Sequence, residues 1–295
     1  MLSGDSRVSR KNEPVTTGRR GLKDADEDDG AGKMHEMQMI SVVPRDRPKS
    51  ILHVDNVTLQ YKTPVNLVTA TYRVCFDVYE ADRFVILGQS GCGKSTLLKA
   101  VGGYMRPTEG SIRLHGVDIT APGPDRVMVF QEFDQLLPWK TVRENILFAF
   151  SASGRFKGND AQQRADYFIE KVGLSKFSSS YPHTLSGGMK QRVAIARGLA
   201  MEPKILLMDE PFASLDALTR RKMQEELLQL WNETHVTIFF VTHSIEEAVR
   251  LGNRILLMSP HPGQVRAEFN GLPARASEAD ATALERRIHE ILFER

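Results

Sequence analysis

A short glycine-rich segment, residues 88–96 (GQSGCGKST), constrains the fold of this chain more than any other feature. It follows the apolar run RFVILG and precedes the helical pattern KSTLLKAVGGY, so it joins a buried strand to the start of a helix. Its spacing satisfies G-x-x-x-x-G-K-[ST], and in this strand–turn–helix context the backbone N–H groups of such a loop cradle phosphates. A glycine-rich turn without that role is the less favoured interpretation. The segment predicts a nucleotide-binding α/β domain.

The residue types of this loop suit a nucleoside triphosphate, ATP, together with Mg²⁺. Glycines let the backbone approach the phosphates, Lys94 supplies a positive charge to the β- and γ-phosphates, and the Ser95 hydroxyl ligates Mg²⁺. Because Cys92 lies inside the loop, we expect its thiol to react with maleimides and the adduct to block ATP binding. The residues expected to contact the nucleotide are Gly88, Gln89, Ser90, Gly91, Cys92, Gly93, Lys94, Ser95 and Thr96.

Short apolar runs alternate with helical patterns from Phe84 onward, including RVMVF, KILLMD and TIFFVTH. Buried strands that alternate with helices predict a mostly parallel sheet covered on both faces. Between Glu132 and Thr184 the strand patterns stop, which predicts a helical insertion over about residues 132–184. We divide the chain into a disordered tail (1–49), an ATPase domain (50–265) and a C-terminal strand and helix (266–295). The final helix places Leu284, Ile288, Ile291 and Leu292 on one face, which we expect to dock on its own domain.

Polar residues follow three of the apolar strands, at the point where each strand ends. Gln131 follows VMVF, Asp209 and Glu210 follow ILLM, and His243 follows TIFFVT. The carboxyl ends of parallel strands share one edge of the sheet, so these side chains should gather near the phosphates. We expect Asp209 to hold Mg²⁺ through water and Glu210 to be the general base for the attacking water. A solvated strand-end carboxylate remains the alternative for Glu210.

A second candidate anion site lies in LSGGMKQR, residues 185–192, at the start of an alanine-rich helix. A serine and two glycines there leave backbone N–H groups pointing outward at the positive end of the helix dipole. An ordinary serine N-cap explains the same residues equally well. The phosphate loop leaves the γ-phosphate open on one side, which this second site is suited to close.

Charge, cysteine content and hydropathy exclude several classes of protein. Basic and acidic residues number 39 and 37, so there is no electrostatic footprint for nucleic acid. Two cysteines cannot build a disulfide framework, and their scarcity fits a reducing compartment. No apolar run approaches the roughly 20 residues that span a bilayer, and no signal-peptide pattern opens the chain. We expect a protein in the cytosol or held at a membrane face by a partner.

Together these motifs resemble the nucleotide-binding subunit of an ATP-binding cassette (ABC) transporter over about residues 50–265. The matching motifs are the phosphate loop, the Q-loop residue Gln131, the signature LSGGMKQR, the run ILLMDEP, the D-loop SLD (214–216) and the switch residue His243. The resemblance implies an α/β P-loop cassette with a mixed, largely parallel core sheet, an N-terminal antiparallel β part and a helical subdomain. It also implies a catalytic contribution from Gln131 and His243, with Gln131 close to Mg²⁺.

The resemblance implies a head-to-tail homodimer, in which the signature of one chain covers the ATP held by the other. Ser186, Gly187 and Gly188 would then contact the neighbour's nucleotide. It also implies that Tyr61 stacks on adenine, although an edge-strand tyrosine is the alternative. Stacking on a base is worth about 1–3 kcal/mol.

Three longer runs resemble the nitrate, sulfonate and taurine importer group: VFQEFDQLLPWKTVRENI, DEPFASLDALTR and VTHSIEEAVRLGNRILLMSPHPG. This implies an ATPase on the cytoplasmic side of the membrane that powers a permease, with a separate solute-binding protein. The solute would be a small anion: nitrate, an aliphatic sulfonate, taurine or a bicarbonate-like ion. We expect the apolar cluster of Phe133, Leu136, Leu137 and Trp139 to dock on the permease, although it can instead pack inward as core.

Two other functions share the same motifs. An ABC-type ATPase of DNA maintenance or translation can carry an LSGG signature, but the chain has one cassette, no long heptad arms and no basic face. A regulatory ATPase outside transport is the second alternative. A non-hydrolysing regulator should lack Glu210 or His243, and both are present.

Overall fold

The computed structural model of the chain describes residues 49–62, 66–131, 135–273 and 275–293. The predicted tail lies outside these ranges except for Lys49, and so does Phe133 of the predicted docking cluster. No helix within the described ranges combines the length and apolar character that a membrane crossing requires.

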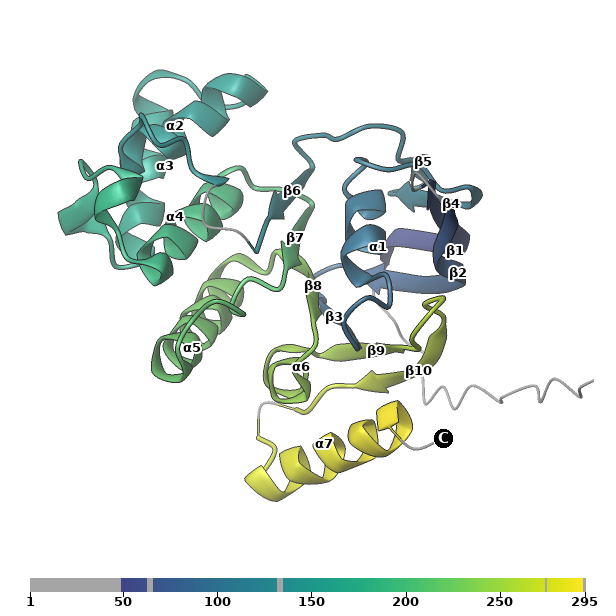
Figure 1. The fold of residues 1–295 in the computed structure, drawn as a ribbon. Helices are drawn as coiled ribbons and strands as arrows, with labels where there is room; N and C mark the ends of the chain where they lie inside the picture. Colours follow the sequence, from purple (N-terminus) through teal and green to yellow (C-terminus); the bar gives the residue numbers. More distant parts are fainter. Residues whose placement is uncertain (1–48, 63–65, 132–134, 274, 294–295) are drawn as a thin grey trace, which may run out of the picture. The chain divides into compact units, whose positions relative to one another are not determined.

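Two sheets form the framework (Figure 1). The first is antiparallel, in the order β2 (Leu67–Tyr79), β1 (Ser50–Lys62), β4 (Glu109–Leu114) and β5 (Val117–Asp118). The second has the order β10 (Val265–Asn270), β9 (Arg254–Met258), β3 (Arg83–Gly88), β8 (Thr237–Thr242), β7 (Ile205–Asp209) and β6 (Arg126–Val129). Its strands pair in parallel, except that β10 is antiparallel to β9. The predicted fold class, with an antiparallel β part beside a mixed, largely parallel sheet, is confirmed.

Within the described residues, the chain between β6 and β7 forms helices and turns without strands. They are α2 (Val142–Ser153), α3 (Gly158–Lys171), the 3₁₀ turns Ser175–Phe177 and Pro182–Thr184, and α4 (Gly187–Ala200). Figure 1 shows α2 and α3 beside α4, beyond the β6 edge of the sheet. A capping box starts α2, because Thr141 and Glu144 satisfy each other's backbone N–H groups.

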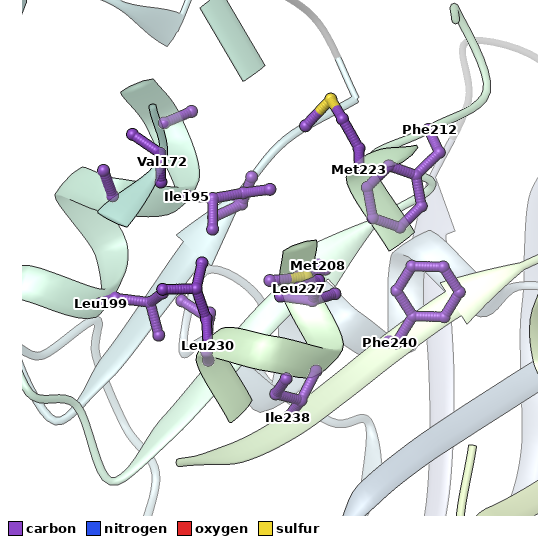
Figure 2. Packing of buried hydrophobic residues seen from close by; sticks show 14 of the residues in the cluster. Val172, Ile195, Leu199, Met208, Phe212, Met223, Leu227, Leu230, Ile238 and Phe240 are labelled. Atoms are coloured by element: carbon purple, nitrogen blue, oxygen red, sulfur yellow. The ribbon is translucent and has the colours of Figure 1, made fainter. Parts of the chain in front are cut away.

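The alternation of side chains along the central strands divides the core into two clusters. In β7, Ile205 and Leu207 face the cluster shared with α1 (Lys94–Val101) and the antiparallel sheet. Leu206 and Met208 face the opposite cluster, shared with α4, α5 (Ala217–Thr234) and α6 (Ile245–Leu251). Met208 of β7 and Leu227 of α5 are both labelled among the residues of this second cluster in Figure 2. Because the side-chain period of a strand is two, a strand buried on both faces is apolar throughout.

The C-terminal part of the chain packs on the same sheet. The strand that begins at Val265 extends the six-stranded sheet, and α7 (Glu278–Phe293) lies beside α6. Ile288 and Leu292 of α7 are buried, with Leu284 and Ile291 packed around them. Burying each aliphatic side chain is worth about 1.5–3 kcal/mol. The prediction that the final helix docks on its own domain is confirmed.

Candidate functional site

A pocket of about 230 Å³ lies over the phosphate loop, between that loop and the antiparallel sheet. Tyr61, Val68, Thr69 and Ala70 line it from β1 and β2, and Glu210 and His261 line it from the loops after β7 and β9. The loop itself contributes Ser90, Gly91, Gly93, Lys94, Ser95 and Thr96. The structure thus brings Tyr61, most of the phosphate loop and Glu210 to one cavity.

The ammonium group of Lys94 is buried at the base of this pocket. Its Nζ donates to the carbonyl oxygens of Gly88 (2.8 Å) and Gln89 (3.0 Å), and lies 3.8 Å from Oε1 of Glu210. Lys94 starts α1 directly after Gly93, which has φ 92°. A Cβ at Gly93 would come within 2.6 Å of the Ala70 carbonyl oxygen, so glycine is required here for both conformation and space.

Ser95 and Asp209 meet at the predicted metal site. The Ser95 hydroxyl donates to Oδ1 of the buried Asp209 at 2.8 Å. Burial raises the pKa of Asp209, and the hydrogen bond from Ser95 opposes that rise. A hydroxyl and a carboxylate are oxygen ligands that Mg²⁺ accepts, and Mg²⁺ is usually held by one or two carboxylates together with substrate phosphates. The described residues contain no cluster of three or more His, Cys, Asp or Glu side chains arranged for a metal.

Glu210 and His243 are joined at the carboxyl ends of two neighbouring parallel strands, β7 and β8. Nδ1 of His243 lies 2.9 Å from Oε2 of Glu210, and the Glu210 N–H donates to the Val241 carbonyl. Glu210 has φ 42°, which non-glycine residues rarely adopt. Its carboxylate is therefore held between the imidazole of His243 and the ammonium of Lys94, with one edge on the pocket.

Gln131 lies apart from these contacts. It is exposed, two residues after the end of β6, and it is not among the described residues that line the pocket. Its roles beside Mg²⁺ and the γ-phosphate remain predictions.

The signature residues also stand outside the pocket that the same chain forms. Ser186 caps α4, since its Oγ accepts from the Met189 N–H at 3.3 Å. It is exposed, whereas Gly188 is buried and packs on α5, where a Cβ would come 2.9 Å from Cγ2 of Thr219. Neither Ser186, Gly187 nor Gly188 is among the described residues lining the pocket. The N-cap interpretation is thus confirmed, and the anion-binding one remains a prediction.

His261 is a pocket residue that sequence reasoning missed. It follows β9, whose neighbour β3 leads into the phosphate loop. The turn that carries it is fixed to β2, because Gly263 N–H donates to Ala70 and Tyr72 N–H donates to Gly263, both at 2.9 Å. A Cβ on Gly91 (φ 81°) would come 3.1 Å from Cε1 of His261. Its place after a parallel strand is the same signal that identified Gln131 and His243.

The Cys92 side chain is fully buried and is not among the described residues that line the pocket. A Cβ on Gly88 would come 2.7 Å from its Sγ, so the thiol lies beneath the loop against β3. Burial raises the pKa of this thiol, although Lys94 opposes the rise. The expectation that Cys92 reacts readily with maleimides is therefore wrong for the folded chain, because the loop wraps around the side chain. The predicted contact of Cys92 with the nucleotide stays a prediction, and the burial of the side chain leaves it to the backbone.

Comparisons with known proteins agree with this geometry. Residues 72–213 match the ABC transporter family. The chain is 51% identical over 203 residues to the taurine import ATP-binding protein TauB of Rhizobium johnstonii, covering 69% of this chain and 77% of that one. It is 41% identical over 245 residues to the nitrate import ATP-binding protein NrtD of Synechococcus elongatus, covering 82% and 89%. Among solved structures, a dimeric ATP-binding cassette bound to ADP and Pi is similar, with a TM-score of 0.65, 31% identity, and coverage of 76% of this chain and 100% of that one.

The compared proteins are transport cassettes, and they give no support to the DNA-maintenance, translation or regulatory alternatives. The pocket lies over a phosphate loop and is lined by the ion pair of Glu210 and Lys94. Such a site can bind and hydrolyse a nucleoside triphosphate. The chain belongs to the ABC transporter family, as one of its ATP-binding ATPase subunits.

Proposed function

We propose that this ABC ATPase hydrolyses ATP to drive the import of a small anionic solute through a membrane permease. The observation that carries the hydrolytic part is the position of the Glu210 carboxylate, at the edge of the nucleotide pocket and in contact with His243 and Lys94. The likeness to taurine and nitrate import proteins supports import and the class of solute. A taurine-, sulfonate-, nitrate- or bicarbonate-like anion fits this group.

The predicted site residues have distinct roles in this proposal. Lys94 and the backbone of the phosphate loop bind the phosphates, and Tyr61 stacks on adenine. Ser95 and Asp209 would hold Mg²⁺, with Gln131 near it, and the ion supplies neutralisation of the phosphate charge. Glu210 accepts the proton of the attacking water, and His243 fixes its carboxylate.

We infer a head-to-tail homodimer in which each signature segment completes the site of the other chain. The absence of Ser186, Gly187 and Gly188 from the described lining of their own pocket supports this arrangement. The N-terminus of a helix such as α4 suits an anion brought by a neighbour. The similar solved cassette is dimeric and bound to ADP and Pi.

The permease would dock on the helical region through a surface, here called the patch, that includes the exposed side chains of Trp139 and Phe148. Trp139 is 69% exposed and Phe148 is 46% exposed, and Nζ of Lys140 between them in the chain lies 5.7 Å from the Phe148 ring centre. Leu136 is only 3% exposed and belongs to the core, so its predicted part in docking is corrected. An exposed pair of large aromatic side chains is typical of a protein contact.

Buried Asn145 holds the loop that presents this patch. Its side-chain oxygen accepts from the Leu137 N–H at 2.8 Å, and its Nδ2 donates to the carbonyls of Leu137, Lys140 and Thr141. A loop held in this way can transmit a movement of the helical region to a docked partner. The subunit would sit on the cytoplasmic face of the membrane, and a separate solute-binding protein would deliver the anion.

Reconstitution with its cognate membrane permease tests the proposal. Vesicles should take up labelled taurine, nitrate or bicarbonate with Mg²⁺-ATP supplied on the side of this subunit, and Glu210→Gln should abolish uptake. Absence of Mg²⁺-ATP hydrolysis by the wild-type complex would overturn the catalytic part. Hydrolysis without uptake of any of these anions would overturn the solute class.

A further inference from the structure

Glu247 is a buried carboxylate close to the catalytic pair, because it is hydrogen-bonded to Thr242, the residue before His243. Glu247 is on α6, four residues after His243, and is almost completely buried. Its Oε2 accepts from Thr242 Oγ1 at 2.6 Å, and its Oε1 accepts from Gln224 Nε2 of α5 at 3.2 Å. A buried carboxylate is costly unless it is hydrogen-bonded and paired with a charge. Burial raises the pKa of Glu247, while Thr242 and Arg220 oppose the rise.

Arg220 is the charged partner of Glu247, and it reaches a second element at the same time. Its Nε lies 3.9 Å from Oε1 of Glu247 and donates to the Phe212 carbonyl at 3.3 Å. Its Nη2 donates to the Leu215 carbonyl at 2.9 Å. Phe212 and Leu215 belong to the segment that follows Glu210, and Ala213 N–H in that segment donates to the Glu210 carbonyl. One guanidinium thus ties the segment after the catalytic glutamate to the helix after the switch histidine.

The helix that carries Arg220 also supports the signature segment. Thr219, its neighbour in the chain, packs on Gly188 at the start of α4. Two turns further along α5, Glu226 accepts from Arg192 of the signature run at 2.8 Å. Met223 of α5 and Phe212 belong to the same core cluster, and both are labelled in Figure 2. The start of α5 therefore contacts three parts of the chain. Arg220 reaches Glu247 and the segment after Glu210, and Thr219 packs on the signature helix α4.

We propose that Arg220 is a positioning residue that fixes the signature segment Ser186–Gly188 relative to the catalytic pair Glu210 and His243 of the same chain. This rests on the proposed function, in which the catalytic pair serves the chain's own nucleotide and the signature serves the partner's. Arg220 then links the geometry of one composite site to that of the other. Its planar fork of donors spans two carbonyls and a carboxylate, whereas the donors of a lysine ammonium are all on one compact nitrogen.

The test uses ATP-driven dimerisation of the purified chain in a Glu210→Gln background, measured by analytical ultracentrifugation across ATP concentrations. Arg220→Gln should weaken dimerisation by about tenfold, a usual size for coupling between sites. ATP binding to the single chain should stay unchanged, because Arg220 does not line the pocket. Arg220→Lys should restore dimerisation only in part. Arg221→Gln is the matched control, since that side chain is 70% exposed and pairs with Glu225 on its own helix.

Ser186→Arg in the same background separates this inference from the proposed function. If Ser186→Arg leaves dimerisation intact, the trans signature is wrong, and the role of Arg220 falls with it. If Ser186→Arg prevents dimerisation while Arg220→Gln behaves like Arg221→Gln, only the role of Arg220 is overturned. If Arg220→Gln lowers the melting temperature more than Arg221→Gln does, Glu247→Gln is tested in its place. The proposal expects Glu247→Gln to weaken dimerisation. Dimerisation equal to that of Arg221→Gln would contradict it.

Discussion

His243 and Glu210 lie 33 positions apart in the chain, yet the imidazole Nδ1 of the first is 2.9 Å from the carboxylate of the second. Parallel pairing of β7 and β8 brings them together, since each follows the carboxyl end of its strand. The contact fixes the direction of the carboxylate at the edge of the pocket. A positioned carboxylate is what a general base requires.

Replacing Glu210 by glutamine should preserve ATP binding and remove turnover. The amide keeps the shape of the side chain but cannot accept a proton, and loss of a general base typically costs about 10²–10⁴ in rate. The variant should also accumulate as an ATP-bound dimer, because hydrolysis is what reopens it. Phosphate release and nucleotide binding measure the two effects, and Glu246→Gln, an exposed carboxylate on α6, is the control. Near-normal phosphate release would remove Glu210 from this role.

Mixing two inactive chains tests the composite site. Lys94→Ala disables a chain's own phosphate loop, and Ser186→Arg disables the signature that it offers to its partner. In a mixed head-to-tail dimer both changes fall in one site, and the second site stays intact. Occlusion of labelled ATP should therefore appear in the mixture and be absent from each variant alone. Full occlusion by Ser186→Arg alone would contradict the trans arrangement.

Trp139→Asp should disrupt assembly with the permease while leaving the fold and ATP binding unchanged. Trp139 is largely exposed, so the aspartate remains in water. Leu136→Asp is the contrast, because it places a charge in the core and should unfold the chain. Co-purification with the permease and thermal melting of the isolated subunit measure these outcomes. If Trp139→Asp co-purifies normally with the permease, the docking surface does not include Trp139.

Thiol labelling should distinguish the two cysteines. Cys75 is exposed and should react with maleimide in the folded chain, whereas Cys92 should react only after unfolding. Burial raises the pKa of Cys92, so at neutral pH it holds less of the reactive thiolate as well as being inaccessible. Peptide mass spectrometry of labelled, folded protein reads this directly. Rapid labelling of Cys92 in the folded chain is the contrary result.

His261→Ala should weaken ATP binding, because it removes a side chain that lines the pocket and packs against the phosphate loop. Gly91→Ala should weaken it further, through a Cβ directed at His261 and a φ of 81° that alanine disfavours. The double variant loses the tight contact with His261 but keeps the backbone strain at position 91, so it should bind ATP better than Gly91→Ala and more weakly than wild type. Titration with a fluorescent ATP analogue measures all three. If His261→Ala and wild type bind the ATP analogue with equal affinity, His261 does not contribute to nucleotide binding.

Local sequence determined the elements and much of the site. The phosphate loop is encoded by glycine spacing and one lysine, the buried strands by continuous apolar runs, and the cap of α4 by Ser186. Such features depend on residues close together in the chain, where backbone conformation and strand or helix period are set. The positions of Asp209, Glu210 and His243 at the ends of predicted parallel strands then identified them as site residues.

Only the tertiary structure decided where particular side chains point and which distant residues they meet. It turned Cys92 beneath the loop, placed Leu136 in the core with Trp139 outside, and brought His261 to the pocket. Sequence spacing cannot fix these choices, because each depends on the space left by elements far away along the chain. The separation of Ser186 from the pocket of its own chain is of the same kind, since it follows from the packing of α4 on α5.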